Sequence, residues 1–493
     1  MNGNLIVSFF QKFQDRAQIL TAVFIALALV LGGTLGYTVT LTDKPVIVLI
    51  GTLGLLVFLA AVLSAQFGLL ILLFLTYTRF SDVAIQYEHA PSVAKFFVFL
   101  LGVAILLRWA IFHETPSGWR SLVIFSGLYI FMASLSLFYA PDVSLVSQAL
   151  SDLIKDVTIA IMIVTLLKSQ VELRRAIWAL LWAGIFMGTL SVIQYLTGTF
   201  TNNYGGFAQA PFLQVVGDVQ GYRISGPIGD PNFYAQAMVV LVPLAIERFL
   251  DEREVKYRLL ALWALVVCFL TVIFTFSRGG FLALCVALAV WFFIHPPRGL
   301  YLALAIVLAI AVIAFIPQNY VNRLMTLQQI FPSSTNGFYT QDQSIQGRAS
   351  ENLTSIAMFL DHPLLGVGYF NYELYYLQYA EQIGLAPDAS ARAAHNLYLQ
   401  VLAETGLLGL TAFLTLLWAA IKGALDSFRK FKSSNRKELV SMTVAIGAGF
   451  AGYLAAAVFV HAAYPRYLWL IIGVVFSLPN IVKAELSKNY QTV

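Results

Sequence analysis

The chain has 493 residues, of which 59% are hydrophobic and 11% are charged, and its mean hydropathy is +0.79. A soluble globular protein carries about 25% charged residues, so this composition excludes a soluble multidomain enzyme, a nucleic-acid-binding protein and a disordered scaffold. We expect the formal net charge of +5 to reside in loops that orient the chain in a bilayer. Cys268 and Cys285 both fall in apolar runs, which excludes a disulfide framework.

Apolar runs recur along the chain at about the 20-residue length that a helix needs to cross the hydrocarbon core. Only helices and closed barrels satisfy every backbone hydrogen bond in lipid. We therefore predict an all-α, polytopic membrane protein with about 12–14 transmembrane helices. The predicted spans are 18–39, 45–63, 67–79, 92–108, 120–139, 149–168, 175–197, 232–249, 257–276, 279–294, 299–316, 397–421, 438–461 and 467–484.

Three of these runs are atypical. The first follows Lys12 and Arg16 and lacks an A-x-A-like cleavage site, so we interpret it as a retained helix rather than a signal peptide. The run 67–79 is short enough for a re-entrant segment. The run 149–168 carries Asp152, Lys155 and Asp156 near its start, so we expect it to lie partly at the membrane interface.

The distribution of basic residues predicts the orientation. Between two predicted spans, the sequence KGALDSFRKFKSSNRKE at 422–438 holds six basic residues, which predicts a cytoplasmic loop because Lys and Arg accumulate on that side. Alternating the spans from this loop places both termini of the multi-pass chain in the cytoplasm.

Two long segments fall on the extracytoplasmic side. The segment 198–231 is polar and Gly-rich, and 317–396 is the longest non-membrane stretch. Because 317–396 contains helix-like pieces such as ENLTSIAMFLDHP, we expect a folded lid rather than a slack loop. The chain is thereby divided into an N-terminal transmembrane bundle (1–197), a transmembrane region with an outer loop (198–316), a lid (317–396) and C-terminal transmembrane helices (397–493).

The same topology places Arg223, Arg278, Arg348 and His395 on the extracytoplasmic side. Each has an ordinary structural explanation: Arg278 can snorkel from a helix end, and Arg348 can pair with Glu351 within a helix. The combination favours chemistry, because guanidinium binds phosphate oxygens bidentately and histidine accepts a proton near neutral pH. Together these groups indicate transfer of a group that is carried on a lipid phosphate.

Three stretches carry a family resemblance: SRGGFLAL at 277–284, DHPLLGVGYFNYE at 361–373 and HNLYLQVLAETGLLGL at 395–410. They resemble the signatures of the bacterial O-antigen ligase / O-antigen polymerase superfamily, over about residues 220–420. The resemblance implies a metal-independent glycosyltransferase without a cofactor and with a periplasmic lid. Such enzymes move a glycan from undecaprenyl pyrophosphate to an acceptor, which is a lipid A–core sugar in ligases and another lipid-linked repeat in polymerases. Ligases and polymerases share these motifs, so the motifs do not distinguish the two activities.

The resemblance also implies residue roles. The family histidine maps onto His395, and the family arginines map onto Arg278 and, less directly, onto Arg223 and Arg348. We expect the arginines to bind the pyrophosphate and His395 to deprotonate the acceptor hydroxyl, which inverts the anomeric configuration.

Further candidates lie near these positions. Asp230, Asn232 and Glu404 are candidates for binding sugar hydroxyls or orienting the histidine. The tyrosines at 369, 372, 375 and 376 can stack on sugars, although packing within the lid is the ordinary explanation. No cluster of Asp, Glu and His has metal-ligand spacing, so no metal site is predicted.

The leading alternative is a transporter of a small anion such as bicarbonate, since transporters also have many spans and some relatives of the superfamily have been described this way. The depth of the charges discriminates the two: a transporter keeps ionisable residues within its spans, whereas these arginines lie at outer loop ends. A structural scaffold would leave the charged outer loops unexplained. The expected partners are the lipid-linked donor, the glycan or lipid A–core acceptor and membrane lipids, with no nucleic acid.

Overall fold

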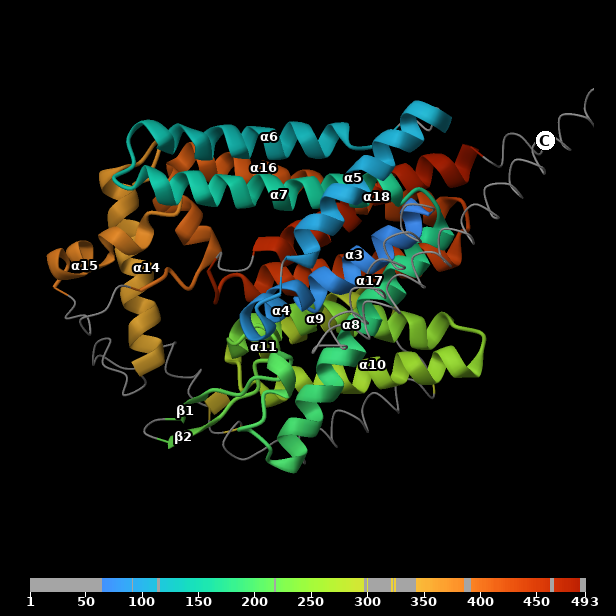
Figure 1. Cartoon of the computed structure of the whole chain (residues 1–493), viewed down its shortest axis with the longest axis horizontal. Helices are drawn as coiled ribbons and strands as arrows, with labels where there is room; N and C mark the ends of the chain where they lie inside the picture. Colours follow the sequence, from blue (N-terminus) through green and yellow to red (C-terminus); the bar gives the residue numbers. More distant parts are fainter. Residues whose placement is uncertain are drawn as a thin grey trace, which may run out of the picture. The chain divides into compact units, whose positions relative to one another are not determined.

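The computed structural model describes residues 64–90, 92–112, 116–216, 219–296, 299, 321, 323–324, 343–384, 392–461 and 465–487. From Leu69 onward these residues belong to one compact unit, Leu69–Val493 (Figure 1). The predicted spans at 18–39, 45–63 and 299–316 lie outside the described residues. The four-segment division of the chain stays a prediction.

Helices account for almost all of the described structure, which confirms the predicted all-α, polytopic membrane class. By length and composition, seven of the described helices are able to cross a membrane, or eight if one bent pair counts as a single span. Each predicted span that the structure describes coincides with a helix. Apart from the bent pair, the helices that coincide with predicted spans are α5 (Val93–Phe112), α6 (Arg120–Ser134), α7 (Val143–Leu166), α8 (Gln170–Thr197), α9 (Pro231–Asp251), α10 (Val255–Phe274), α11 (Arg278–Ile294), α16 (Leu397–Ser433), α17 (Lys437–Ala456) and α18 (Pro465–Ser487).

The two atypical runs within the described residues have structural explanations. The run 67–79 forms α3 (Ala65–Tyr77), which is bent by 55° against α4 (Phe80–Glu88). The charged run 149–168 is part of the 24-residue helix α7, where Asp156 is buried and lies 3.0 Å from the Arg466 side chain of α18. This ion pair explains how a carboxylate is tolerated inside an apolar helix bundle.

Side-chain caps determine where three important helices begin. The carboxylate of Asp230 accepts hydrogen bonds from the first turn of α9, and the side chains of Ser277 and Asn396 do the same for α11 and α16. Such a cap stabilises a helix by about 1 kcal/mol. The caps before α11 and α16 place Arg278 and His395 at helix ends rather than within the spans.

Helix α9 lies at the centre of one helix group. Almost every residue of α9 is buried, and α8, α10, α11 and α17 pack against it. Small residues permit the close approach: a Cβ on Gly280 would lie 2.5 Å from Ala235, and one on Gly452 would lie 2.7 Å from Val239. Small residues at helix contacts are the usual way in which membrane helices pack closely.

A second group contains α6, α7, α16 and α18, and it carries the lid. Helices α14 (Gln343–Asp361) and α15 (Tyr372–Gln382) lie at one end of α6, α7 and α16 (Figure 1). Tyr372 and Tyr376 are each 1% exposed and form the centre of the lid's own core. These two predicted sugar-stacking candidates therefore serve packing.

Two predicted loops contain regular structure. The segment 198–231 includes the short helix η2 (Tyr204–Gly206) and an antiparallel hairpin of β1 (Phe212–Val216) and β2 (Val219–Tyr222). The basic segment 422–438 is helical except around its turn: α16 continues to Ser433 and α17 begins at Lys437. The prediction of an inter-span loop there was wrong for most of its length, because the charged residues extend α16 beyond its apolar part.

Helix α16 is broken at Gly406, and the lid fills the break. Gly406 has φ 64° and ψ −166°, a conformation that favours glycine. The backbone N–H of Leu407 donates to the carbonyl of Pro363 at 2.9 Å, and the N–H of Val367 donates to the carbonyl of Ala403 at 2.9 Å. Backbone groups at such depth must be paired within the protein, and here the lid peptide supplies the partners.

Candidate functional site

Asn232 joins two turns that are distant in sequence. Arg223, from the loop before α9, is 5% exposed and donates from Nε to the Thr275 carbonyl at 2.9 Å. Its second guanidinium nitrogen donates to Asn232 Oδ1 at 3.3 Å. The hydroxyl of Ser277 donates to the same oxygen at 2.9 Å. Two uncharged oxygens thus accept from a buried guanidinium beside the start of α11, and Ser277 fixes one of them.

The Ser-Arg-Gly-Gly turn brings Arg278 to the same place. Arg278 is 5% exposed and begins α11, one residue after the cap Ser277. Directly after it, a Cβ on Gly279 would lie 2.7 Å from the Phe459 side chain. Only glycine permits this close approach between α11 and the turn that follows α17. Arg223 and Arg278 therefore lie in one cluster with Asn232, which we call the arginine cluster (Arg223, Asn232, Ser277 and Arg278).

His395 forms a dyad with a carboxylate. Its Nδ1 lies 2.9 Å from Oε2 of Glu351 and 3.1 Å from the Ala393 carbonyl. With Nδ1 donating to these oxygens, Nε2 is the nitrogen that accepts a proton. The His395 side chain is 32% exposed, and within the described residues no hydrogen bond occupies Nε2. Such a histidine–carboxylate pair on a partly exposed side chain is able to accept a proton at Nε2.

His461 connects the dyad to the arginine cluster. The His461 ring centroid lies 5.1 Å from that of His395 and 5.0 Å from that of Phe233, the residue after Asn232. Its buried Nδ1 has no hydrogen-bond partner among the described residues. Burial, with a smaller contribution from the neighbouring His395, lowers the pKa of His461 to about 3. This imidazole is therefore neutral at physiological pH.

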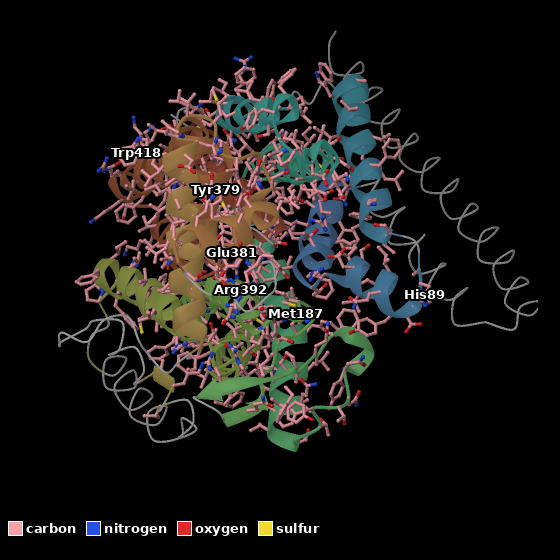
Figure 2. The ribbon with its side chains drawn as sticks, turned by 90° about the vertical axis from the view of Figure 1, so that its left-hand side faces the viewer. His89, Met187, Tyr379, Glu381, Arg392 and Trp418 are labelled. Carbon is pink, nitrogen blue, oxygen red and sulfur yellow. The ribbon has the colours of Figure 1, made fainter. Side chains whose placement is uncertain are left out.

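Helix α14 supplies the remaining charged groups. It carries Glu351 and, three residues earlier, Arg348, which is on the same helix face. From the segment before α16, Arg392 brings a guanidinium nitrogen to 3.8 Å from Oε1 of Glu351. Figure 2 looks onto the lid and shows Arg392 beside α14. Arg348 is thus placed on the helix that holds the dyad, whereas Arg223 and Arg278 are placed directly in the arginine cluster.

Two predicted candidates have structural roles. Asp230 caps α9 and accepts from the backbone N–H groups of Asn232 and Phe233 at 2.7 and 3.1 Å. Glu404 is buried in α16, about two and a half turns from His395, and accepts from Gln400 Nε2 at 3.0 Å. Asn232 is brought to the arginine cluster, and Glu404 is not.

Three residues of the site escaped the sequence analysis in their present roles. Glu351 was considered only as a partner of Arg348, whereas its carboxylate contacts His395 and Arg392. Arg392 and His461 were not considered. His461 could have been found from the topology, because it ends the predicted span 438–461 on the extracytoplasmic side. Within the described residues, no group of three or more His, Cys, Asp or Glu is arranged to hold a metal ion.

Comparison with known families identifies the class of protein. Residues 263–414 match the family model for O-antigen ligase. This match supports membership of the O-antigen ligase superfamily. The match includes Arg278, Glu351 and His395, whereas Arg223 and Asn232 precede it. No curated protein matches the sequence.

The match indicates the general activity. Together with the apolar helices, it supports a multi-pass membrane enzyme that transfers glycans, with glycan or lipid-linked substrates. The family match favours this activity over the transporter alternative.

Proposed function

We propose that the enzyme transfers a glycan from undecaprenyl pyrophosphate to an acceptor hydroxyl at the extracytoplasmic face of the inner membrane. The observation that carries the proposal is the proximity of the arginine cluster and the Glu351–His395 dyad, linked through Phe233 and His461. Cations that bind phosphate and a base that activates a hydroxyl are the two groups that this reaction needs.

The arginines hold the pyrophosphate of the donor. Guanidinium groups grip phosphate oxygens in pairs and stay charged at every working pH. In this role Arg223 and Arg278, with Arg348 from the lid, neutralise the negative charge that grows on the leaving group as the sugar–phosphate bond breaks. Because pyrophosphate is a good leaving group, no general acid is required, and the guanidiniums take the place of a metal ion.

His395 activates the acceptor. Nε2 removes the proton of the acceptor hydroxyl, and the oxygen attacks the anomeric carbon as the bond to the pyrophosphate oxygen breaks. The proton passes to His395, the electron pair passes to undecaprenyl pyrophosphate, and attack opposite the leaving group inverts the configuration. Glu351 holds the imidazole in the tautomer that this step needs and stabilises the imidazolium that forms.

The length of α16 supports the extracytoplasmic assignment. His395 lies just before the first residue of α16, and the basic residues from Lys422 onward lie near its other end. The chain over α16 is long and apolar enough to cross a membrane, with the break at Gly406 toward the end that carries His395. If the basic end is cytoplasmic, the dyad lies on the outer side.

Two experiments test the proposal. Purified wild-type protein is expected to consume an undecaprenyl-pyrophosphate-linked glycan, release undecaprenyl pyrophosphate and form an inverted linkage, with full activity in EDTA. Failure to consume the donor would reject the function.

For the topology, Ile345→Cys in a chain lacking Cys268 and Cys285 is expected to react with an impermeant thiol reagent on intact spheroplasts. Reaction only after lysis would place the lid on the cytoplasmic side and would contradict the proposed topology.

A further inference from the structure

A cavity of about 320 Å³ lies between the α3–α4 bend, α7, the start of α18 and the lid. This volume falls at the lower end of the range of about 300–1,000 Å³ typical of small-ligand sites. Tyr369 of the lid and Tyr467 of α18 form aromatic walls. The polar lining is supplied by Arg79, Asp82, Gln148, Asp152, Asp156 and Arg466.

The cavity adjoins the proposed catalytic centre. A guanidinium nitrogen of Arg79 lies 3.5 Å from the carbonyl of Ile228, in the turn that leads to Asn232. Tyr467 donates to the Tyr77 carbonyl at 2.9 Å, and Tyr77 donates to the Ala237 carbonyl of α9 at 2.7 Å. These contacts connect the cavity with the first turns of α9, where Asn232 joins the arginine cluster.

The charges in the cavity are already paired. Arg79 lies 3.0 Å from Asp82, Arg466 lies 3.0 Å from Asp156, and Asp152 lies 2.8 Å from Lys155. A guanidinium that is neutralised in this way does not attract a diphosphate. Paired carboxylates and guanidiniums instead offer acceptors and donors together, next to tyrosine rings. This combination suits an uncharged molecule with many hydroxyls and apolar C–H faces.

We propose that this cavity binds an uncharged sugar of the acceptor glycan. The inference rests on the proposed function and adds a second subsite to it: the arginine cluster for the charged donor headgroup, and the cavity for the neutral acceptor. Gln148 and Asp152 of α7 contact the sugar hydroxyls, and the ring of Tyr369 lies against the sugar.

The experiment measures glycan binding without any donor. Labelled full-length protein in lipid nanodiscs is applied to a printed array of neutral and acidic oligosaccharides. Gln148→Ala and Asp152→Asn are the test variants, because both residues are exposed on α7 and neither substitution disturbs the core. Ser151→Ala is the matched control, since Ser151 is exposed on the same helix and does not line the cavity. Thermal unfolding confirms that all three variants are folded.

We expect the wild-type protein and Ser151→Ala to bind a common set of neutral glycans, and both cavity variants to lose at least tenfold of that signal. Cavity variants that keep the wild-type signal would overturn the assignment. An array on which the wild-type protein binds only acidic glycans, or no glycan, would overturn it as well. Because the array contains no donor, its outcome is independent of the donor-consumption assay, which alone decides the proposed function.

Discussion

The two ends of helix α9 each hold a buried arginine, and the two arginines have different partners. At the C-terminal end, Arg248 is fully buried and contacts Glu247, with Glu252 at 3.1 Å and Glu438 at 3.6 Å. At the N-terminal end, Arg223 donates to the Thr275 carbonyl and the Asn232 amide oxygen. One guanidinium contacts carboxylates, and the other is held by uncharged oxygens.

This difference is the one expected between a structural arginine and the arginine proposed to bind a ligand. Carboxylates neutralise the charge of Arg248, so its guanidinium is not expected to attract an anionic ligand. Through these contacts Arg248 connects α9 to the start of α17. The Thr275 carbonyl and the Asn232 amide oxygen orient Arg223 without cancelling its charge, as expected for the anion-binding role proposed for it. Burial of an arginine therefore does not identify a functional site; the identity of its hydrogen-bond partners does.

The largest expected effect is on catalysis at the N-terminal end. His395→Ala and Arg278→Ala are each expected to lower glycan transfer by about 10³-fold, because a general base and a charge-stabilising donor are each worth about 10²–10⁴ in rate. Product formation from the lipid-linked donor is the measurement, with thermal unfolding in detergent as the control for folding. A His395→Ala protein that transfers glycan at the wild-type rate would show that the dyad is not the base.

The second effect concerns stability at the C-terminal end. Arg248→Ala is expected to destabilise the fold by about 3–5 kcal/mol, because it strands buried carboxylates without their partner. Arg223→Ala is expected to lower stability less, since Thr275 and Asn232 are uncharged, and to lower activity more. Thermal unfolding and transfer rates of both variants give the comparison. Equal stability losses would contradict the distinction drawn between the two ends.

Glu351 offers a smaller, more specific effect, as a carboxylate that is paired with a histidine. Glu351→Gln is expected to lower kcat by about 10- to 100-fold, a range typical of residues that orient a functional histidine. The KM for the donor is expected to stay unchanged, and Glu351→Asp should restore part of kcat. A rise in donor KM with normal kcat would instead mean that Glu351 shapes the donor site.

The smallest effect is a pH dependence of stability that arises from His461. Because its pKa is about 3 in the folded protein and near 6.5 when unfolded, the unfolded state binds more protons between these values. Stability therefore falls as the pH drops below 6.5, by about 2 kcal/mol at pH 5. His461→Phe is expected to reduce this dependence, measured as the shift in unfolding temperature between pH 7.5 and pH 5.

An exposed histidine provides the control for this measurement. His89 lies at the surface (Figure 2), and His89→Asn should keep the wild-type pH dependence. A His461→Phe protein with the wild-type shift would show that the buried imidazole is not responsible.

The positions of the helices could be predicted from the sequence because apolar runs and lipid thickness leave few choices. Alternating the spans from one basic segment also placed Arg223, Arg278 and His395 at one end. Alternating the spans requires no knowledge of how the helices pack, so the shared side of these three residues could be predicted without the structure.

Pairings between distant segments could not be predicted. Glu351 and His395 are 44 residues apart, and on a helix Glu351 has a nearer basic partner in Arg348. The break at Gly406 depends on a peptide 40 residues earlier, and backbone hydrogen bonds of that kind leave no periodic pattern in the sequence. The continuation of α16 through its basic residues was missed because a charge run was equated with a loop.

The docking of residues 363–368 into the break of α16 makes the lid and the membrane helix a single hydrogen-bonded unit. Gly366 has φ 71°, and a Cβ there would lie 2.4 Å from the backbone of Glu404. The lid peptide and α16 therefore each depend on a glycine at their contact. Chimeric enzymes that exchange lids between homologues must therefore exchange residues 403–408 at the same time. A graft of the lid alone would introduce the peptide 363–368 of one homologue against residues 403–408 of another, and the hydrogen bonds between them would be lost.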